Sequence, residues 1–543
     1  MAPRTLVAAL ATGTMALPAR ALGTAAWKTR PLLAREITRP RARTLCSAVS
    51  VGPLASQLRD PTLFRQQAYV DGQWMDASSG DTFSVSDPAT GELLGVCADM
   101  GCAETVVAIA AAKAALPGWS GWTGKERAAV LRRWYELMMA NQHDLALIMT
   151  REQGKPLAES LGEISYAASF CEWFGEEAKR VAGQVLSCPT PGRRIVTMKQ
   201  PVGVAAAITP WNFPSAMITR KAAPALAAGC TMVVKPSDLT PYSALALCEL
   251  AHRAGVPPGV LSVVTASVGN APAVGDAMCA SSDVRKLSFT GSTAVGKLLM
   301  RQCSGTVKRL SLELGGNAPF IVFDDCDLDK AVEGAVAAKF RNAGQTCVCT
   351  NRLFVQRQVH QAFVAKFATA VSKLKLGIGT DPSTTTGPLI NPAAVTKVEA
   401  LVADAVTKGA TVVVGGSSGG RPGNFFAPTV LDGCDATMLL ATQEIFGPVA
   451  PIFVFDTEAE AIAAANDTPA GLAAYCFTRD LSRAWRVAER LEYGIVGVNA
   501  GVVSNEVAPF GGFKESGLGR EGSSVGIDEY LEVKSVTMAV DDA

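Results

Sequence analysis

The 543-residue sequence predicts an α/β protein built from two doubly wound domains. Buried strands alternate with helices between residues 202 and 316, and repeated βαβ units of this kind form a parallel sheet with helices on both faces. A second αβ series runs from about residue 317 to residue 500, with strands at FIVF (320–323), ATVVVGG (410–416), PIFVF (451–455) and GIVGVN (494–499). The length is sufficient for two or three domains.

Short strands and two helices precede the first series. YVDGQW (69–74) and SVSDPATGELLGVC (84–97) combine strand-forming residues with turn residues. Thr123 and Glu126 form a capping box that begins a helix. Its apolar face continues through Val130, Trp134, Leu137 and Leu145. The second helix has an apolar stripe of Leu161, Ile164, Ala168, Cys171 and Phe174. Both stripes predict core packing.

The first series contains the loops where a ligand is expected. Its strands are predicted at VGVAAAIT (202–209), TMVVKPS (231–237), LSVVTA (261–266), KLSFTG (286–291) and KRLSLELGG (308–316). Helices are predicted through TRKAAPALAAG (219–229) and at 242–254 and 270–279. Doubly wound sheets bind ligands at the carboxyl ends of their strands. The loops predicted at that edge are PWNFP (210–214), KPSD (235–238) and FTGSTAVG (289–296).

The charge distribution separates the first 50 residues from the rest. The whole chain has a formal net charge of +1, which argues against a nucleic-acid partner because such proteins need a concentrated basic face. Residues 1–50 contain seven Arg and one Lys but a single acid, Glu36, so the remainder has a net charge of −6. This composition predicts a mitochondrial transit peptide, with a basic tail of another use as the alternative. No apolar run reaches the roughly 18–20 residues of a membrane span, so no membrane partner is expected.

Cysteine usage predicts reduced, mostly structural thiols. Fourteen cysteines are scattered along the chain without a secretory segment. In FRNAGQTCVCTNR (340–352), Cys347 and Cys349 have no histidine or second cysteine pair nearby to complete a zinc site, so no metal is expected. The three histidines lie in no motif, which argues against a Cys-His or Ser-His catalytic pair. Core packing is the default role of a single cysteine.

Two of the loops have the chemistry of a nucleotide site. FTGSTAVG follows a strand and begins a helix, where free backbone N–H groups attract a phosphate. KPSD supplies a cation and an acid, and an acid at this place suits a ribose diol and repels a 2′-phosphate. Each loop alone is weak evidence, and KPSD by itself fits a solvated turn equally well.

Seven stretches taken in order carry a resemblance that none carries alone. PWNFP, KPSD, FTGSTAVG, LELGG (312–316) and GQTC (344–347) are followed by EIFGPV (444–449) and PFGGFKESGLGRE (509–521). This set resembles the NAD(P)-dependent aldehyde dehydrogenase superfamily over about 480 residues. MITRK (217–221), FRNAGQTCVC and the GLGREGS…GIDEYLE ending are most similar to the mitochondrial succinate-semialdehyde dehydrogenases within it.

The resemblance implies the catalytic residues. Cys347 matches the nucleophile, whose thiolate attacks an aldehyde carbonyl to give a thiohemiacetal. Asn212 matches the residue whose amide stabilises the oxyanion together with the backbone N–H of Cys347. Glu313 matches the general base that hydrolyses the thioester left after hydride transfer to nicotinamide.

The resemblance also implies NAD as the cofactor. The matching positions are Trp211, Lys235, Pro236, Ser237, Asp238, Gly291, Ser292, Thr293, Gly296, Glu444 and Phe446. Lys235 and Asp238 are expected at the adenine ribose, Gly291 to Gly296 at the pyrophosphate, and Glu444 with Phe446 at the nicotinamide ribose and ring. NAD-using relatives usually have Glu in place of Asp238, so the charge favours NAD while the shorter side chain leaves some NADP use open.

The implied substrate is a small aldehyde with a carboxylate. Arg220 and Arg341 match the family's carboxylate-binding arginines, and Ser504 matches its hydroxyl contact. An arginine fork meets a carboxylate bidentately. The expected activity is NAD-dependent oxidation of succinate semialdehyde to succinate in 4-aminobutyrate breakdown, in the mitochondrial matrix. The alternatives are a glutarate-semialdehyde or general aldehyde dehydrogenase, and a non-catalytic protein that keeps the fold.

The resemblance divides the chain into domains. It assigns 1–50 to the transit peptide, 60–184 and 204–312 to an NAD-binding domain, 313–505 to a catalytic domain, and 185–203 and 525–543 to a small β oligomerisation element. EYLEVKSVTMAV (529–540) has the pattern of an exposed edge strand, which proteins rarely leave unpaired. In this family it pairs with a neighbouring subunit, so a homodimer or homotetramer is expected.

Cys349 adds a redox hypothesis. A catalytic thiolate is the form that oxidants attack, and a sulfenic acid at Cys347 can condense with Cys349 to a reversible disulfide. The short ring strains such a bond and makes it easy to reduce. Resemblance to the mammalian mitochondrial member of the family, which carries the same Cys-x-Cys, favours this hypothesis. The alternative is that Cys349 is a small buried residue behind the nucleophile.

Overall fold

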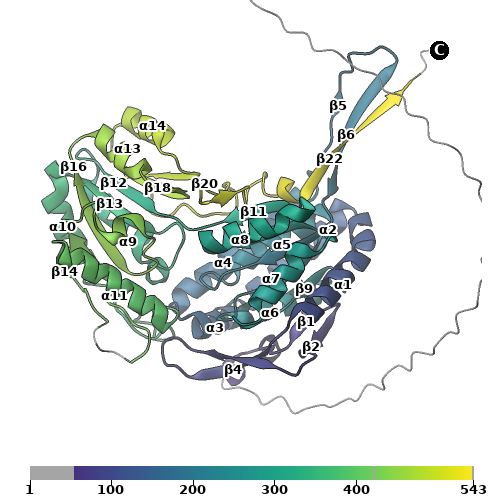
Figure 1. The fold of residues 1–543 in the computed structure, drawn as a ribbon, viewed down its shortest axis with the longest axis horizontal. Helices are drawn as coiled ribbons and strands as arrows, with labels where there is room; N and C mark the ends of the chain where they lie inside the picture. The colour runs from purple at the N-terminus through teal and green to yellow at the C-terminus, as the bar shows by residue number, and fades with distance from the viewer. Residues whose placement is uncertain (1–53, 419, 421, 541–543) are drawn as a thin grey trace, which may run out of the picture. The chain divides into compact units, whose positions relative to one another are not determined.

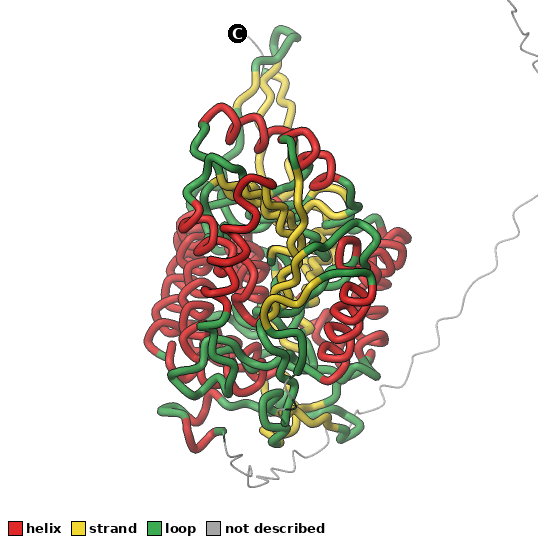
Figure 2. Tube along the Cα trace, turned by 90° about the vertical axis from the view of Figure 1, so that its left-hand side faces the viewer, coloured by secondary structure: helices red, strands yellow, loops and turns green. Residues whose placement is uncertain are grey.

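Two sheets, each with a core of parallel strands, organise the protein (Figure 1). The structure is a computed structural model that describes residues 54–418, 420 and 422–540, and the expected transit peptide lies outside these residues. Figure 2 shows the strands between two layers of helices. The prediction of an α/β fold with two doubly wound sheets is therefore confirmed. Within the described ranges, no helix is long and apolar enough to cross a membrane.

The first sheet has eight strands in the order β2-β1-β9-β8-β7-β10-β11-β21. Its parallel core consists of β7 (Val204–Ile208), β8 (Thr231–Lys235), β9 (Leu261–Val263), β10 (Val284–Thr290) and β11 (Arg309–Glu313). Antiparallel strands complete the edges: β1 (Ala68–Val70), β2 (Gln73–Met75) and β21 (Gly517–Leu518). The strand order reverses between β7 and β10, and ligands of doubly wound sheets bind at such a reversal.

Eight helices pack around this sheet in the described part of the chain. They are α1 (Cys102–Gly121), α2 (Gly124–Ala140), α3 (Gln142–Gln153), α4 (Leu157–Glu177), α5 (Ala216–Ala228), α6 (Pro241–Ala254), α7 (Ala271–Ala280) and α8 (Thr293–Cys303). The predicted capping box begins α2, where the Thr123 hydroxyl accepts from the Glu126 N–H. A hairpin of β3 (Thr82–Ser86) and β4 (Leu93–Ala98) precedes α1.

The predicted continuation of the α2 face to Leu145 is wrong, because α2 ends at Ala140 and Leu145 belongs to α3. The physical reason is Asn141, whose side-chain amide donates to the Leu137 carbonyl at 2.8 Å and caps the end of α2. Leu145 is nevertheless buried in the same apolar core as Trp134.

The second sheet has seven strands in the order β14-β15-β16-β13-β12-β18-β19. Its strands are β12 (Ala318–Val322), β13 (Thr350–Gln356), β14 (Thr411–Val414), β15 (Thr429–Asp432), β16 (Val449–Phe455), β18 (Ala473–Phe477) and β19 (Ile495–Val498). Only the pairing of β14 with β15 is antiparallel. The associated helices are α9 (Leu328–Phe340), α10 (Arg357–Val371), α11 (Pro392–Thr407), α12 (Leu439–Thr442), α13 (Glu458–Asn466) and α14 (Leu481–Arg490).

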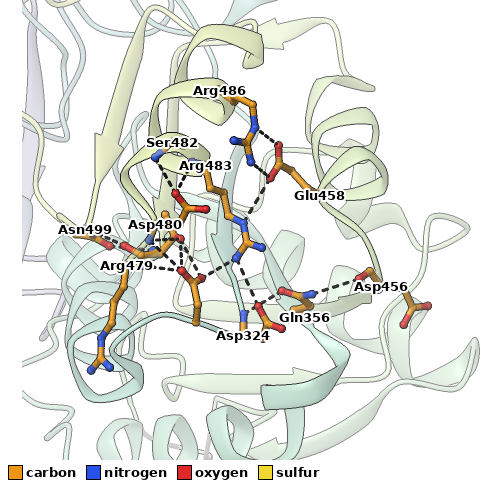
Figure 3. Close-up of polar contacts among 12 residues, drawn as sticks. Asp324, Gln356, Asp456, Glu458, Arg479, Asp480, Ser482, Arg483, Arg486 and Asn499 are labelled. Atoms are coloured by element: carbon orange, nitrogen blue, oxygen red, sulfur yellow. Dashed lines mark hydrogen bonds and ion pairs between the residues drawn. The ribbon is translucent and has the colours of Figure 1, made fainter.

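Charged side chains fill the carboxyl edge of this second sheet (Figure 3). Asp325, just after β12, accepts hydrogen bonds from the Thr478 hydroxyl at 2.7 Å and from the Asp480 N–H at 3.0 Å, at the start of α14. Arg483 adds a 2.7 Å ion pair to Asp325. A carboxylate of the chain itself therefore occupies the place at the strand reversal between β12 and β18 where a ligand anion would otherwise bind.

A separate three-stranded sheet contains the segment predicted to mediate assembly. Its order is β22-β6-β5, with β5 (Val185–Leu186), β6 (Arg193–Pro201) and β22 (Leu531–Ala539). β22 runs antiparallel to β6 from Leu531 opposite Pro201 to Ala539 opposite Arg193, and its other edge is unpaired in the described chain. The sheet projects away from the two large ones (Figure 1).

Candidate active site

The loop that carries Cys347 connects α9 to β13 and turns sharply. Asn342 and Ala343 have φ angles of +52° and +53°, and Gly344 has +75°. A Cβ on Gly344 would lie 2.2 Å from the Gly447 carbonyl oxygen, so only glycine fits. The turn brings Cys347 to the carboxyl edge of the first sheet although it precedes a strand of the second.

Hydrogen bonds tie this loop to PWNFP, which follows β7. The Asn212 side-chain amide donates to the Gln345 carbonyl at 3.0 Å. The Asn212 carbonyl accepts from the Asn342 side chain at 3.0 Å and from Lys155 Nζ at 2.8 Å. All four residues are buried. The arrangement fixes the Asn212 amide beside the nucleophile loop.

A cavity of about 300 Å³ brings most of the predicted catalytic and cofactor residues together. Its lining includes Trp211, Asn212, Gly291, Ser292, Glu313, Cys347, Glu444 and Phe446. The cavity lies at the strand reversal between β7 and β10, because two of its lining loops, PWNFP and FTGSTAVG, are at the carboxyl ends of these two strands.

Six predicted cofactor residues do not line this cavity: Lys235, Pro236, Ser237, Asp238, Thr293 and Gly296. Asp238 lines a neighbouring cavity of about 420 Å³, which shares Ile390 and Asn391 with the first. Thr293 and Gly296 lie in the first turn of α8. Gly296 serves packing there, since a Cβ would lie 2.4 Å from Leu314.

The 300 Å³ cavity has features that suit a phosphate group and an aromatic ring. Ser292 caps α8 by accepting from the Val295 N–H, so the positive end of the helix faces the cavity beside Gly291. Trp211 and Phe446 meet edge to face with ring centroids 5.6 Å apart, and both line the cavity as an aromatic wall. Glu444 accepts from the Gly316 N–H at 3.0 Å, which orients its carboxylate.

Glu313 is a buried carboxylate without a hydrogen-bond partner among the described residues. Burial raises the pKa of Glu313 well above its ordinary value, and the charge of Glu521 raises it further against the opposing effect of Arg220. This shift favours the protonated form, and a buried carboxyl group with a perturbed pKa in a cavity is a candidate for proton transfer.

Glu521 was not predicted as a site residue, although it ends the PFGGFKESGLGRE motif. It forms buried ion pairs with Arg220 and Lys221 of α5. Burial opposes its ionisation, but Lys221 and Arg220 lower the pKa of Glu521. Its segment lies between the predicted domains. In the structure this segment adds β21 to the edge of the first sheet and forms a separate two-stranded sheet, in which β20 (Phe513–Lys514) pairs with β17 (Ala470–Gly471).

The Cys347 thiol is neutral at rest. Burial raises the pKa of Cys347 to about 12, because the opposing charge of Arg220 is weaker than desolvation and Glu313 adds to it. A nucleophilic role for Cys347 therefore requires a base that removes the thiol proton.

The predicted substrate residues lie on the other side of Cys347. A narrow cavity of about 10 Å³ is lined by Cys347, Arg220, Arg341 and Ser504. It shares Arg341 and Ser504 with a larger cavity of about 260 Å³. Arg341 stacks 5.2 Å from the Phe213 ring, and Arg220 stacks 4.1 Å from Phe510. Cys347 thus lines both the 300 Å³ cavity and the narrow cavity that contains the two guanidinium groups.

Cys349 is buried, two positions after Cys347. Its thiol donates to the Lys339 carbonyl at 3.0 Å, and its N–H donates to the Thr346 carbonyl at 2.9 Å. Both Cys347 and Cys349 are free thiols in this structure.

Comparison with known proteins decides the family. The profile of the Aldehyde dehydrogenase family matches residues 74–536. The chain belongs to this family. A glutarate-semialdehyde dehydrogenase of Pseudomonas putida is 61% identical over 484 residues, which are 89% of this chain and 100% of the relative. A succinate-semialdehyde dehydrogenase [NADP(+)] of Escherichia coli is 61% identical over 478 residues, covering 88% of this chain and 98% of the relative.

A plant relative and a solved structure are similar to this chain over most of its length. A mitochondrial succinate-semialdehyde dehydrogenase of Arabidopsis thaliana is 56% identical over 485 residues, covering 89% of this aldehyde dehydrogenase and 91% of the relative. A crystal structure described as an E. coli NADP-dependent enzyme superposes with a TM-score of 0.88 at 60% identity, covering 89% of this chain and 100% of that one.

The raised pKa of the nucleophile in this aldehyde dehydrogenase is testable without substrate. In the cofactor-free enzyme, iodoacetamide should alkylate Cys347 slowly at pH 7, and the rate should rise about tenfold per pH unit to beyond pH 10, since only the thiolate reacts. Mass spectrometry of the Cys347 peptide measures the rate, with Cys347→Ala as the control. A plateau below pH 8 would contradict the assignment of a neutral resting thiol.

Proposed function

We propose that this aldehyde dehydrogenase oxidises succinate semialdehyde to succinate. The observation that carries the proposal is the pocket in which Arg220, Arg341 and Ser504 adjoin Cys347. Two guanidinium groups beside an aldehyde-reactive thiol suit a short substrate with an aldehyde at one end and a carboxylate at the other. Breakdown of 4-aminobutyrate is the proposed physiological source of this substrate.

Three residues of this chain take part in the proposed catalytic steps: Cys347, Asn212 and Glu313. A base takes the proton of Cys347, and the thiolate adds to the aldehyde carbon. The Asn212 amide then exchanges its bond to the Gln345 carbonyl for the new oxyanion, assisted by the backbone N–H of Cys347. The thiohemiacetal carbon on Cys347 then gives up its hydride, for which a bound nicotinamide would supply the acceptor, and becomes the thioester. Glu313 takes a proton from water, the hydroxide attacks the thioester carbon, and the C–S bond breaks to return the Cys347 thiolate and release succinate.

We infer that NAD is the preferred cofactor. Asp238 places a negative charge in the loop after β8, and such a charge repels the 2′-phosphate of NADP. The E. coli relative is named for NADP, so a side-by-side assay with both cofactors is part of the test.

Glutarate semialdehyde is the second candidate substrate. It has the same two functional groups with one more methylene, and the P. putida relative is named for it. The 260 Å³ cavity beyond Arg341 leaves room for a longer chain.

We also propose a homo-oligomer in the mitochondrial matrix. The unpaired edge of β22 supports assembly, because exposed strand edges pair readily. The arginine-rich first 50 residues and the mitochondrial designation of the A. thaliana relative support the location.

Two substitutions separate the chemical steps and exclude a non-catalytic protein. Cys347→Ala should abolish aldehyde oxidation while NAD still binds, because no thioester can form.

Glu313→Gln should give a burst of about one NADH per active site and then stall at the acyl-enzyme. Stopped-flow absorbance measures the burst. If the burst is absent and both steps slow equally, Glu313 acts earlier, in activating the thiol.

Arg341→Ala tests the substrate class. The KM for succinate semialdehyde should rise roughly ten- to a hundredfold through loss of a charge-assisted hydrogen bond, while the KM for butanal should not change. Arg220→Ala should act in the same direction, but it also leaves Glu521 short of a partner, so Arg341 gives the cleaner test. An equal loss on both aldehydes would show that Arg341 supports the fold and not the carboxylate.

We further propose the Cys347–Cys349 disulfide as a reversible switch. Peroxide converts the Cys347 thiol to a sulfenic acid and water, and condensation with the Cys349 thiol forms the disulfide and releases a second water. Peroxide should inactivate the wild type in a way that dithiothreitol reverses, whereas Cys349→Ala should progress to irreversible acids. Full thiol recovery of that variant would limit Cys349 to packing.

A further inference from the structure

Tyr166 of α4 stands at the junction of the two cavities on the substrate side of Cys347. The 260 Å³ cavity and the narrow cavity at Cys347 share four lining residues: Tyr166, Phe213, Arg341 and Ser504. The Tyr166 ring is held by an edge-to-face contact with Phe170, at 4.9 Å between centroids. A substrate that passes from the larger cavity to the thiol must therefore pass Tyr166.

The Tyr166 hydroxyl is a buried polar atom without a hydrogen-bond partner among the described residues. Burial raises the pKa of Tyr166, and Arg220 opposes that effect both by its charge and by a hydrogen-bonding contact with the hydroxyl. That contact does not reach standard hydrogen-bond geometry, so the hydroxyl has no partner of good geometry among the described residues. Leaving a buried hydroxyl unpaired is unfavourable, and the few such groups in native proteins call for an explanation. A ligand that supplies an acceptor would remove this cost.

The charges around the pocket make a directional donor valuable. Arg220 is already paired with Glu521. Arg341 lies close enough to Glu159 for their charges to interact. Burial raises the pKa of Glu159, and the positive charges of Lys155 and Arg341 oppose that shift. Because each guanidinium faces an acid of the chain, recognition of a substrate carboxylate depends on hydrogen-bond geometry as well as on net charge.

We infer that Tyr166 donates a hydrogen bond from its hydroxyl to the ω-carboxylate of the substrate, as a specificity-determining residue beside Arg220 and Arg341. The inference rests on the proposed function, since it requires a substrate with a carboxylate. An uncharged aldehyde leaves the hydroxyl unpaired, and sites built around a buried donor discriminate against ligands that lack the acceptor.

Tyr166→Phe removes only the hydroxyl and tests the inference. The KM for succinate semialdehyde should rise about tenfold or more, whereas the KM for butanal and the kcat for both aldehydes should stay unchanged. The melting temperature of the free enzyme should not fall, because the deleted hydroxyl forms no hydrogen bond of standard geometry with a described residue. The matched control is Tyr135→Phe on α2, a half-buried tyrosine outside these cavities, which should alter neither KM.

The outcomes separate this inference from the proposed function. If Arg341→Ala discriminates between the two aldehydes and Tyr166→Phe does not, the inference about Tyr166 is overturned and the proposed substrate class stands. If neither variant discriminates, the proposed substrate class fails as well. A fall in melting temperature with equal loss on both aldehydes would make Tyr166 a structural residue and overturn the inference.

Discussion

The backbone carbonyl of Asn212 is where the two halves of the active site are joined. It accepts from Lys155, which lies in the loop between α3 and α4, and from Asn342, which lies in the loop leading into the second sheet. The Asn212 side chain returns a bond to Gln345. Cys347 precedes a strand of the second sheet, whereas Glu313 and FTGSTAVG belong to the first, so this junction holds the two loops at one place.

Burial sets the electrostatic behaviour of the joined site. The same enclosure that keeps the Cys347 thiol neutral also raises the pKa of Glu313 well above its ordinary value. Arg220 and Lys221 both form ion pairs with Glu521. These buried cations are therefore balanced by Glu521, and neither forms an ion pair with Glu313. Glu313 therefore stays free to exchange a proton, which a salt-bridged carboxylate could not do as readily.

The two large sheets share a topology and differ in use. In each, parallel strands extend in both directions from the first strand of the series: five parallel strands around β7 in the first sheet and six around β12 in the second. The first sheet leaves a 300 Å³ cavity at its reversal, bordered by small residues such as Gly291. The second fills the corresponding place with Asp325 and Arg483. Its strand order alone would predict a second ligand site, and only these side chains show that the place is taken.

The sequence by itself determined the alternation of elements, the α2 cap, the loops at the carboxyl edge and the residues that match family motifs, because these signals come from neighbours within a few positions. The tertiary structure decided the cap of α2 at Asn141 and the pairing of residues 506–524 with β11 and β17. It also decided the surroundings of Glu521 and Tyr166. Arg220 and Glu521 are 301 positions apart, and no local pattern reports which charge meets which. The unpaired hydroxyl of Tyr166 likewise exists only once packing has excluded water from it, so chain folding, and not residue type, makes it a candidate donor.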